Sequence, residues 1–280
     1  MAKVGPVAAT DLFARRATLR RSVRLLAEFR FEQRDPARFY GALADDTAEM
    51  VGDLWRSATG TAPGGQTVLD VGGGPGYFAA AFASRGMRYI GVEPDPAELH
   101  GVPPEARAAV SDAPPAAVSD APPAAGDRGA AYVRASGMAL PFANGSVDVC
   151  LSSNVAEHVR EPWRLGREML RVTRPGGLAI LSYTVWLGPF GGHEMGLTHY
   201  LGGERAAARY TRTHGHQPKN NYGSSLFAVS AADGLQWAHS TGALLAAFPR
   251  YHPRWAWWMT RAPVLREFLV SNLVLVMTPR

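Results

Sequence analysis

An aspartate and four glycines lie close together in the segment from Thr67 to Phe78, which reads Thr-Val-Leu-Asp-Val-Gly-Gly-Gly-Pro-Gly-Tyr-Phe. The apolar residues that flank Asp70 are typical of a strand buried on both faces of a parallel sheet. The glycines permit a tight turn and let another molecule approach the backbone closely. Because Phe78 and Phe82 recur at helical spacing, the segment predicts a strand, a glycine loop and a helix, an arrangement that binds nucleosides.

The spacing of the glycines distinguishes two kinds of nucleoside site. A dinucleotide-binding fingerprint has a third glycine three residues after its second, and Tyr77 occupies that position here. This spacing argues against a nicotinamide-dependent oxidoreductase. The pattern is instead Asp-x-Gly-x-Gly-x-Gly, formed by Asp70, Gly72, Gly74 and Gly76.

A second acidic residue, Glu93, ends the next apolar run, 23 residues after Asp70. An acid about 20 positions beyond a glycine loop can accept hydrogen bonds from both ribose hydroxyls. Glu93 is therefore the predicted ribose ligand. Asp95 precedes Pro96 and is interpreted as the N-cap of a short helix.

The pattern around Asp70 resembles motif I of the class I S-adenosylmethionine-dependent methyltransferases. The segment from Ala135 to Phe142, Ala-Ser-Gly-Met-Ala-Leu-Pro-Phe, is similar to a family segment that reads Gly-Asp-Ala-x-x-Leu-Pro-Phe, whose acid contacts the adenine amino group. Ser136 stands in place of that acid. The resemblance implies an adenine contact through the Ser136 hydroxyl or through the backbone of Gly137 and Met138.

Two later segments continue the resemblance in the same order. Asn-Val-Ala-Glu-His-Val, from Asn154 to Val159, resembles the family segment after the fourth strand, whose backbone contacts the cofactor. A helix that stops at Arg-Pro-Gly-Gly, residues 174–177, and the apolar strand after it resemble the family's fifth strand and its approach. Together these segments cover residues 67–184.

The resemblance implies a fold, a cofactor and a set of residues that bind it. The fold is a doubly wound, Rossmann-like α/β fold with a seven-stranded, mostly parallel sheet, an antiparallel last strand and a substrate lid. The cofactor is S-adenosyl-L-methionine. The predicted cofactor-binding residues are Asp70, Gly72, Gly74, Gly76, Glu93, Ser136, Gly137, Met138 and Asn154.

The chain divides into four predicted regions. Residues 1–64 form a basic helical segment, with eight arginines between Asp11 and Arg38 and a further helix from Asp45 to Trp55. Residues 65–184 form the cofactor-binding core, and residues 185–229 form the lid. Residues 230–280 add a last helix, capped at Ser230, and the final pair of strands.

A tandem repeat interrupts the core. The eight-residue sequence Ala-Val-Ser-Asp-Ala-Pro-Pro-Ala occupies residues 109–116 and again residues 117–124. Paired prolines block both helix and sheet hydrogen bonding, and the composition cannot bury a core. Residues 103–129 are therefore expected to be a disordered surface insertion.

Three histidines are the candidate catalytic bases for an acceptor hydroxyl: His158 after the fourth strand, and His193 and His199 in the lid. An imidazole titrates near neutral pH and can take such a proton. His158 could instead hold its loop by hydrogen bonding. No metal site is expected, because His193-Glu194 begins like a zinc motif but His199 follows His193 by six positions rather than four.

Composition limits the class of protein. The chain has 280 residues, 46% of them hydrophobic, which is enough for one large α/β core. Its single cysteine, Cys150, lies in an apolar strand pattern, so no disulfide framework is expected, as in a cytoplasmic protein. No apolar run is long enough to span a membrane.

Two segments raise the question of peripheral membrane contact. The net charge is +5, and Arg254 stands beside a tryptophan-rich stretch that contains Trp255, Trp257 and Trp258. These residues and the basic N-terminal helices could lie on an anionic membrane surface. The same residues could instead pack on the sheet, with Trp257 and Trp258 turned inward.

The sequence thus predicts a methyltransferase that acts on a small or lipophilic acceptor, such as the hydroxyl of a lipid-linked sugar. Base N-methylation is disfavoured, since the residues after Ser153 lack the prolines and the aromatic ring that stack on an extruded base. Nucleic acid is not the expected partner. Two alternatives stay open: an RNA methyltransferase, which charge alone supports, and a non-catalytic binding scaffold that kept the fold.

Overall fold

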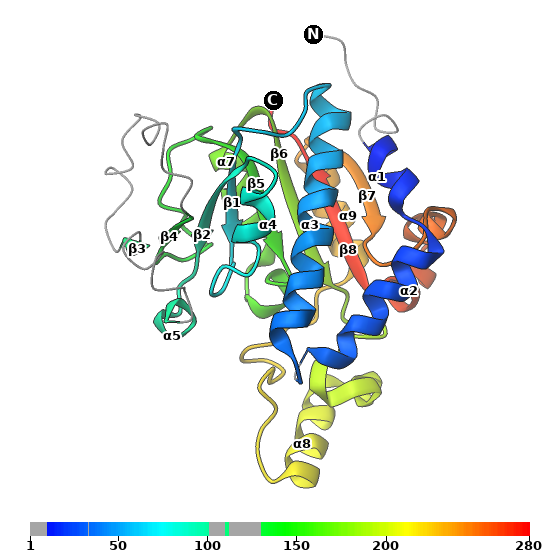
Figure 1. The fold of residues 1–280 in the computed structure, drawn as a ribbon. Helices are drawn as coiled ribbons and strands as arrows, with labels where there is room; N and C mark the ends of the chain where they lie inside the picture. Colours follow the sequence, from blue (N-terminus) through cyan, green and yellow to red (C-terminus); the bar gives the residue numbers. More distant parts are fainter. Residues whose placement is uncertain (1–9, 33, 101–109, 112–129) are drawn as a thin grey trace.

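The structure, a computed structural model, describes residues 10–32, 34–100, 110–111 and 130–280. These residues form one sheet of eight strands with helices on both faces (Figure 1), in the order β3-β4-β2-β1-β5-β6-β8-β7. The strands are β1 (Thr67–Val71), β2 (Arg88–Val92), β3 (Val110–Ser111), β4 (Ala131–Val133), β5 (Val147–Ser153), β6 (Thr173–Thr184), β7 (Leu244–Pro249) and β8 (Asn272–Met277).

The strands from β3 to β6 pair in parallel, and β8 runs antiparallel between β6 and β7. Seven of these strands are the predicted ones. The predicted doubly wound α/β fold with an antiparallel last strand is therefore confirmed. In such a sheet, ligands bind beyond the carboxyl ends of the parallel strands.

Each face of the sheet has its own apolar core. Val68 of β1 lies in the cluster that α3 and α4 cover, and Leu69 lies in the cluster that α7 and α9 cover. Cys150 is fully buried in the second cluster, as predicted. The helices are α1 (Asp11–Arg16), α2 (Leu19–Glu28), η2 (Phe29–Phe31), α3 (Pro36–Thr59), α4 (Ala79–Ala83), α5 (Pro96–Leu99), η4 (Ala156–His158), α7 (Pro162–Val172), η5 (His193–Leu201), α8 (Gly203–His214), α9 (Ala231–Ser240), η6 (Arg254–Arg261) and α10 (Leu265–Leu269).

Two helix boundaries differ from the prediction. The helix expected over Asp45–Trp55 extends from Pro36 to Thr59, because Asp35 accepts a hydrogen bond from the Arg38 N–H and caps its start. The helix α7 ends at Val172, before the Pro-Gly-Gly sequence, and Thr173 already pairs with Val147. Helical backbone is disfavoured at Arg174 because this residue precedes Pro175, so the helix ends before the proline.

The predicted insertion of residues 103–129 lies mostly outside the described residues. Val110 and Ser111 are the exception, because they pair in parallel with Tyr132 and Val133 of β4 and form the eighth strand. The expectation of a disordered segment is wrong for these two residues. They precede the prolines of the first repeat, so nothing in their own sequence blocks strand pairing.

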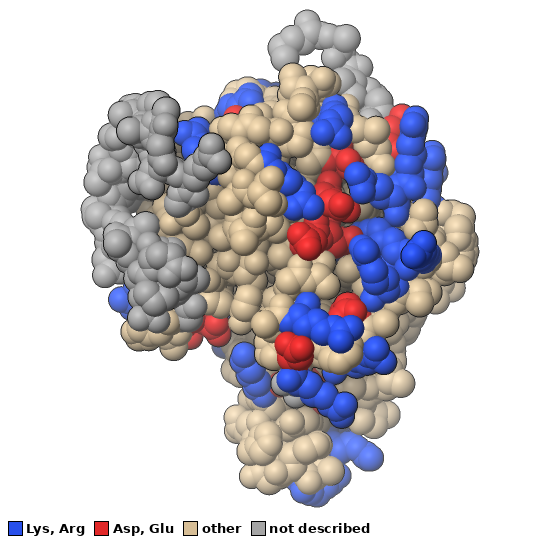
Figure 2. Space-filling model, viewed as in Figure 1, with Lys and Arg blue, Asp and Glu red and all other residues tan. Residues whose placement is uncertain are grey.

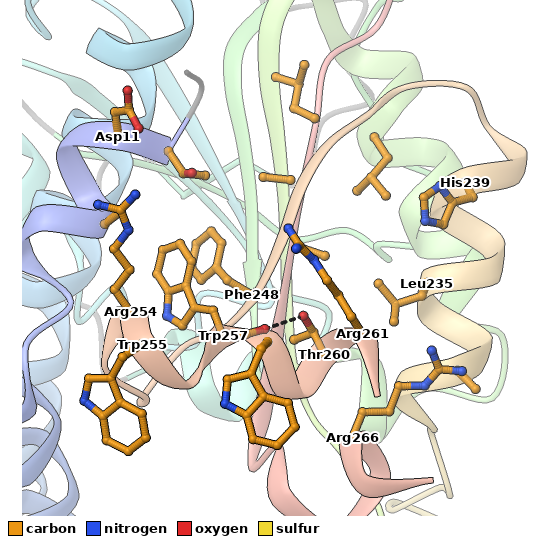
Figure 3. A pocket seen from close by; sticks show the side chains of 18 of the residues that line it. Asp11, Leu235, His239, Phe248, Arg254, Trp255, Trp257, Thr260, Arg261 and Arg266 are labelled. Atoms are coloured by element: carbon orange, nitrogen blue, oxygen red, sulfur yellow. Dashed lines mark hydrogen bonds between the residues drawn. The ribbon is translucent and has the colours of Figure 1, made fainter. Parts of the chain in front are cut away.

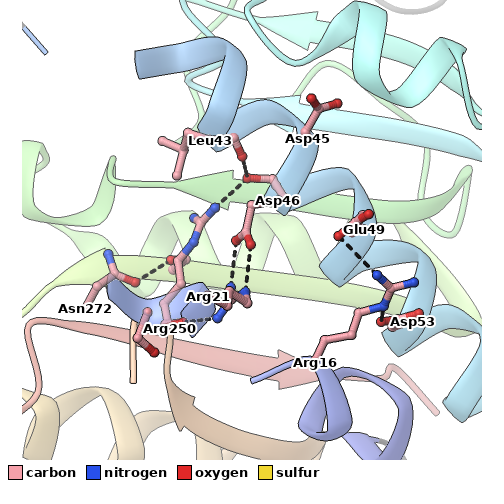
Figure 4. A network of polar contacts seen from close by, with 12 residues as sticks. Arg16, Arg21, Leu43, Asp45, Asp46, Glu49, Asp53, Arg250 and Asn272 are labelled. Atoms are coloured by element: carbon pink, nitrogen blue, oxygen red, sulfur yellow. Dashed lines mark hydrogen bonds and ion pairs between the residues drawn. The ribbon is translucent and has the colours of Figure 1, made fainter. Parts of the chain in front are cut away.

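A buried arginine network joins the N-terminal helices to the sheet (Figure 4). Arg21 of α2 donates to both carboxylate oxygens of Asp46 on α3, at 2.7 and 2.6 Å. It also donates to the carbonyl of Arg250, which follows β7. Arg250 is fully buried and donates to Ser153 at the end of β5 and to Thr47. The basic segment is therefore partly a structural element that fixes the ends of β5 and β7.

The lid segment, residues 185–229, begins where β6 ends and returns to the same place. The Trp186 N–H donates to the Val229 carbonyl at 2.9 Å, which brings the two ends of the segment together. Figure 1 shows its helix α8 beyond the carboxyl ends of the parallel strands. Among the described helices, none combines the length and the apolar composition needed to cross a bilayer.

Candidate active site

The glycine loop follows β1 at the carboxyl edge of the sheet. Gly72, Gly74 and Gly76 have φ angles of 78°, 53° and 82°, in the left-handed region that favours glycine. A Cβ atom at Gly72 would overlap the Val155 side chain, and one at Gly76 would overlap the Tyr132 ring. The loop therefore needs glycine both for its backbone shape and for the side chains packed against it.

Asp70 lies beneath this loop and is 2% exposed. The Tyr89 hydroxyl donates to its carboxylate at 2.8 Å. Burial raises the pKa of Asp70 to about 7, although the hydrogen bond from Tyr89 acts in the opposite direction. Asp70 thus supports the loop from within rather than facing the solvent.

Glu93, at the carboxyl end of β2, joins the glycine loop to the following turn. One carboxylate oxygen accepts from the Gly74 N–H at 3.2 Å, and the other accepts from the Asp95 N–H at 3.1 Å. Burial raises the pKa of Glu93. Each oxygen keeps a further lone pair, so the carboxylate can still accept from ribose hydroxyls. Asp95 caps α5 through the Ala97 N–H, as predicted.

The segment from Ser136 to Met138 follows β4. The Ser136 hydroxyl oxygen accepts from the Met138 N–H at 3.2 Å, which holds the segment in a turn. A Cβ atom at Gly137 would overlap Val71, the last residue of β1, and Leu165. The turn therefore lies against the carboxyl end of β1, the place expected for adenine contacts.

Asn154 follows β5 and has a positive φ of 57°. Its side-chain oxygen accepts from the Asn272 amide at 2.7 Å, which holds this uncommon backbone shape. The next residue, Val155, packs over Gly72. All the predicted cofactor residues thus converge on neighbouring strand ends, while their contact with a cofactor stays a prediction.

Two of the three candidate histidines lie together. The rings of His158 and His193 are 5.1 Å apart, and Glu157 joins them, so that one ligand atom of each residue lies within 4.8 Å of the others. We call Glu157, His158 and His193 the Glu-His cluster. Burial lowers the pKa of His193. At neutral pH this ring is therefore uncharged and able to accept a proton.

His199 has different surroundings. It is 1% exposed, its Nδ1 is 2.8 Å from the Gly196 carbonyl, and its ring lies against Trp186 at 5.3 Å. It is not a member of the Glu-His cluster. Its environment favours a role in packing the lid, so the two clustered histidines are the stronger candidates for chemistry.

Comparison with known proteins identifies the family. A profile described as a methyltransferase domain matches residues 69–181, which run from β1 to β6. A protein of Mycobacterium sp. (strain JLS), named an uncharacterized methyltransferase, is 74% identical over 273 residues, 98% of this chain and 100% of that protein. The chain belongs to the S-adenosylmethionine-dependent methyltransferases. A relative with the same name from Mycobacterium tuberculosis (strain ATCC 25177 / H37Ra) is 70% identical over 98% of this chain and 100% of its own length.

A solved structure shares the fold of this methyltransferase. Geranyl diphosphate methyltransferase in complex with SAM is similar with a TM-score of 0.53 and 16% identity, over 92% of this chain and 90% of that one. At this identity the likeness shows the fold alone. It agrees with the doubly wound sheet and its antiparallel last strand.

A cavity of about 900 Å³ lies elsewhere in the methyltransferase, along the outer strand β7 (Figure 3). Its walls come from α1, α9 and η6, and they include Phe248, Trp257 and Leu235. Three strands, β5, β6 and β8, separate β7 from β1. None of the predicted cofactor or catalytic residues lines this cavity, so it is separate from the predicted site of methyl transfer.

Glu157 is the member of the cluster that the sequence did not single out as functional. It directly precedes His158, and that neighbourhood was the only available signal. His193 lies 35 positions after His158, and only the return of the lid to the sheet edge brings it near. The sequence analysis placed His193 and His199 together in the lid as candidate bases, whereas the structure brings only His193 into the cluster.

Proposed function

We propose that this methyltransferase binds S-adenosyl-L-methionine at the carboxyl ends of β1, β2, β4 and β5 and methylates a hydroxyl oxygen of a small lipophilic acceptor. The observation that carries the proposal is the place of the Glu-His cluster. Glu157 and His158 follow Val155, whose side chain packs on the glycine loop, and the lid supplies His193. Proton-accepting groups thus lie next to the expected cofactor site.

The geometry of the glycine loop supports the cofactor part of the proposal. Between Gly72 and Gly76 the loop carries only the side chain of Pro75, it packs over Asp70 at Gly73, and its Gly74 N–H donates to Glu93. A flat nucleoside with an amino-acid tail can therefore approach the backbone, while Glu93 accepts from the ribose hydroxyls. The turn at Ser136 and the Asn154 backbone would complete the contacts.

The reaction is an in-line displacement. The acceptor oxygen attacks the methyl carbon of the sulfonium, the O–CH₃ bond forms as the S–CH₃ bond breaks, and the sulfur keeps the electron pair as a neutral thioether. The site chiefly supplies alignment and exclusion of water. The hydroxyl proton must leave, and His158 is suited to accept it. Because His158 Nδ1 faces the Ser225 carbonyl at 2.7 Å, it carries the hydrogen, and Nε2 carries a free lone pair.

An exposed surface supports a lipophilic acceptor. Trp255 and Trp258 of η6 are 71% and 53% exposed, and Phe268 of α10 is exposed and stacks near Tyr200 of the lid. The Arg254 N–H donates to the Ala17 carbonyl, so η6 adjoins the basic N-terminal helices. Figure 2 shows Lys and Arg side chains gathered on the side of the molecule where α1 and α2 lie.

Aromatic rings beside arginines suit the interface of an anionic membrane. We therefore propose peripheral contact with the cytoplasmic face of a membrane, from which a lipid-linked acceptor, such as a lipid-linked sugar, would enter the site. The apolar side chains of η6, α10 and η5 would lie nearest the bilayer. The adjoining arginines would contact its headgroups.

The test is incubation with methyl-labelled S-adenosylmethionine and separate lipid and RNA fractions of a mycobacterial extract. The proposal predicts label in the organic phase, linked through oxygen, and none in RNA. Label in RNA alone would instead establish the nucleic-acid alternative. Tight cofactor binding with no label in any fraction would favour the non-catalytic scaffold.

A further inference from the structure

Glu157 is a buried carboxylate whose charge is only partly compensated. It is 1% exposed. One oxygen accepts from the Thr184 N–H at 3.0 Å, and the other has no hydrogen-bond partner. Within the part of the chain that the structure describes, no Lys or Arg forms an ion pair with it. A buried carboxylate with a free oxygen is costly unless a cation lies beside it.

The two histidines of the cluster present free nitrogen atoms. His158 Nδ1 is hydrogen-bonded to the Ser225 carbonyl, which leaves the lone pair on Nε2. His193 Nε2 is buried and has no hydrogen-bond partner. A metal-binding histidine commonly donates its other N–H to a carbonyl in the way that His158 does. Both rings are therefore in a state that can bind a cation.

We propose that Glu157, His158 and His193 bind a divalent transition-metal ion. Three atoms that lie at most 4.8 Å apart are each at most about 2.8 Å from a common centre. Zinc lies about 2.0–2.2 Å from histidine nitrogen and carboxylate oxygen. A shift of about 0.7 Å in each side chain would therefore close the site.

The donor set indicates the kind of metal. Two imidazoles and one carboxylate suit Zn²⁺, Mn²⁺, Fe²⁺ or Co²⁺, whereas Mg²⁺ and Ca²⁺ prefer oxygen ligands. Three protein ligands also leave coordination positions open, as in catalytic rather than structural sites. An oxygen of another molecule could occupy such a position.

The role of the metal rests on the proposed function. Held by Glu157, His158 and His193, the metal would act as a Lewis acid that lowers the pKa of an acceptor hydroxyl, whose proton would pass to water. The acceptor oxygen would then take the methyl group as the S–CH₃ bond breaks, with S-adenosylhomocysteine as the leaving group. The metal would thus hold the acceptor oxygen and activate it, which the histidines would otherwise do alone as bases.

The test measures metal binding without using activity. Tag-free protein is stripped with a chelator and titrated with Mn²⁺, followed by electron paramagnetic resonance, and Zn²⁺ is then added as a competitor. We expect one Mn²⁺ per chain, displaced by Zn²⁺. Glu157→Gln and His193→Ala should each weaken binding at least tenfold.

Matched controls separate this site from surface histidines. His214 and His216 are exposed and lie near each other on the lid, at 6.2 Å between rings, so a His214→Ala, His216→Ala variant removes an adventitious site. This variant should bind Mn²⁺ as the wild type does. Thermal unfolding of each variant confirms that it is folded.

Titration of the same proteins with S-adenosylmethionine separates the two proposals. Cofactor binding with no stoichiometric metal binding, or with metal binding unchanged by Glu157→Gln and His193→Ala, would overturn the metal site and leave the proposed function standing. Failure of the folded wild type to bind S-adenosylmethionine would instead count against the proposed function.

Discussion

Gly60 and Gly76 have nearly the same backbone shape, with φ of 74° and 82°, but different surroundings. A Cβ atom at Gly60 would meet nothing within 4 Å, whereas one at Gly76 would overlap the Tyr132 ring. We expect Gly60→Ala to cost about 1 kcal/mol of stability from backbone strain. Gly76→Ala should cost about 2–4 kcal/mol, because overpacking is added to the strain.

Urea unfolding of the two glycine variants measures this difference. We also expect Gly76→Ala to weaken S-adenosylmethionine binding and Gly60→Ala to leave it unchanged, since only Gly76 belongs to the glycine loop. Equal unfolding free energies for the two variants would contradict the packing seen between Gly76 and Tyr132.

Asp70 should make stability depend on pH. Its pKa is raised by burial to about 7, so the folded protein keeps a proton that the unfolded chain loses near its ordinary value of 3.8. The folded state then binds more protons between about pH 4 and pH 7, and its stability falls as pH rises through this range. Above about pH 7 this contribution becomes constant.

Asp70→Asn removes this proton and keeps an oxygen that can accept from Tyr89. The stability of the wild type relative to Asp70→Asn should therefore fall by roughly 1 kcal/mol per pH unit between pH 5 and pH 7. Urea unfolding of both proteins across this range measures it. Parallel pH profiles would show that Asp70 is ionised throughout.

At the scale of single residues, the sequence predicted the residues whose interaction partners lie near them in the chain or belong to the same motif. The glycine loop, Glu93 and the Asp95 cap have this property, and the structure brings them to the expected strand ends. Glu157 and the place of His199 were not predictable. Their surroundings depend on how the lid folds back, which no local spacing encodes.

At the scale of elements, two neighbouring aspartates on α3 show how the N-terminal helices are held. Asp46 is buried and pairs with Arg21, while the Asp45 side chain is 74% exposed and lies 3.8 Å from Arg85. Removal of Asp46 would leave Arg21 as an uncompensated buried charge. We expect Asp46→Ala to cost about 3–5 kcal/mol and Asp45→Ala at most about 1 kcal/mol.

Chemical denaturation of both aspartate variants tests this role, with Asp45→Ala as the matched control. Loss of the pair should also loosen Arg250, because Arg21 donates to its carbonyl. If Asp46→Ala were as stable as Asp45→Ala, the buried network in Figure 4 would not hold α2 against the sheet.

The three tryptophans of η6 divide between two roles. Trp257 stacks on Phe248 at 4.7 Å and lies near Phe13, whereas Trp255 and Trp258 are exposed. Of the two alternatives that the sequence left open, the one in which both Trp257 and Trp258 turn inward is therefore wrong for Trp258. Helical periodicity could not show this, because the segment is a 3-10 helix rather than an α-helix.

This division gives a prediction with an internal control. Trp255→Ala with Trp258→Ala should reduce binding to vesicles that contain anionic lipid by at least tenfold, with little change in stability. Trp257→Ala should destabilise the fold by about 3 kcal/mol. Vesicle sedimentation and thermal unfolding measure the two effects, with vesicles of neutral lipid as the second control.

The proposed membrane surface would be contradicted by two results. One is equal binding of the wild type to neutral and anionic vesicles. The other is anionic-vesicle binding that the double tryptophan variant leaves unchanged.

At the scale of the whole molecule, the positions of seven strands along the chain followed from the sequence, because most of them are short apolar runs followed by a polar or glycine-rich end. The resemblance supplied the antiparallel last strand. The extra strand β3 did not follow, since Val110 and Ser111 stand beside a repeat that favours disorder. The helices of the lid, η5 and α8, could not be predicted from the sequence either, because the polar residues of the lid show no period that predicts a helix.

The central claim is that S-adenosylmethionine binds at the carboxyl ends of β1 and β2, between the glycine loop and Glu93. Calorimetric titration with S-adenosylmethionine and S-adenosylhomocysteine tests it most directly, on the wild type, on Glu93→Ala and on Glu204→Ala as a control at an exposed acid of α8. We predict micromolar binding that Glu93→Ala weakens at least tenfold, about 1.4 kcal/mol, and that Glu204→Ala leaves unchanged. The claim would be contradicted if the folded wild type bound neither molecule, or if Glu93→Ala bound both molecules as tightly as the wild type does.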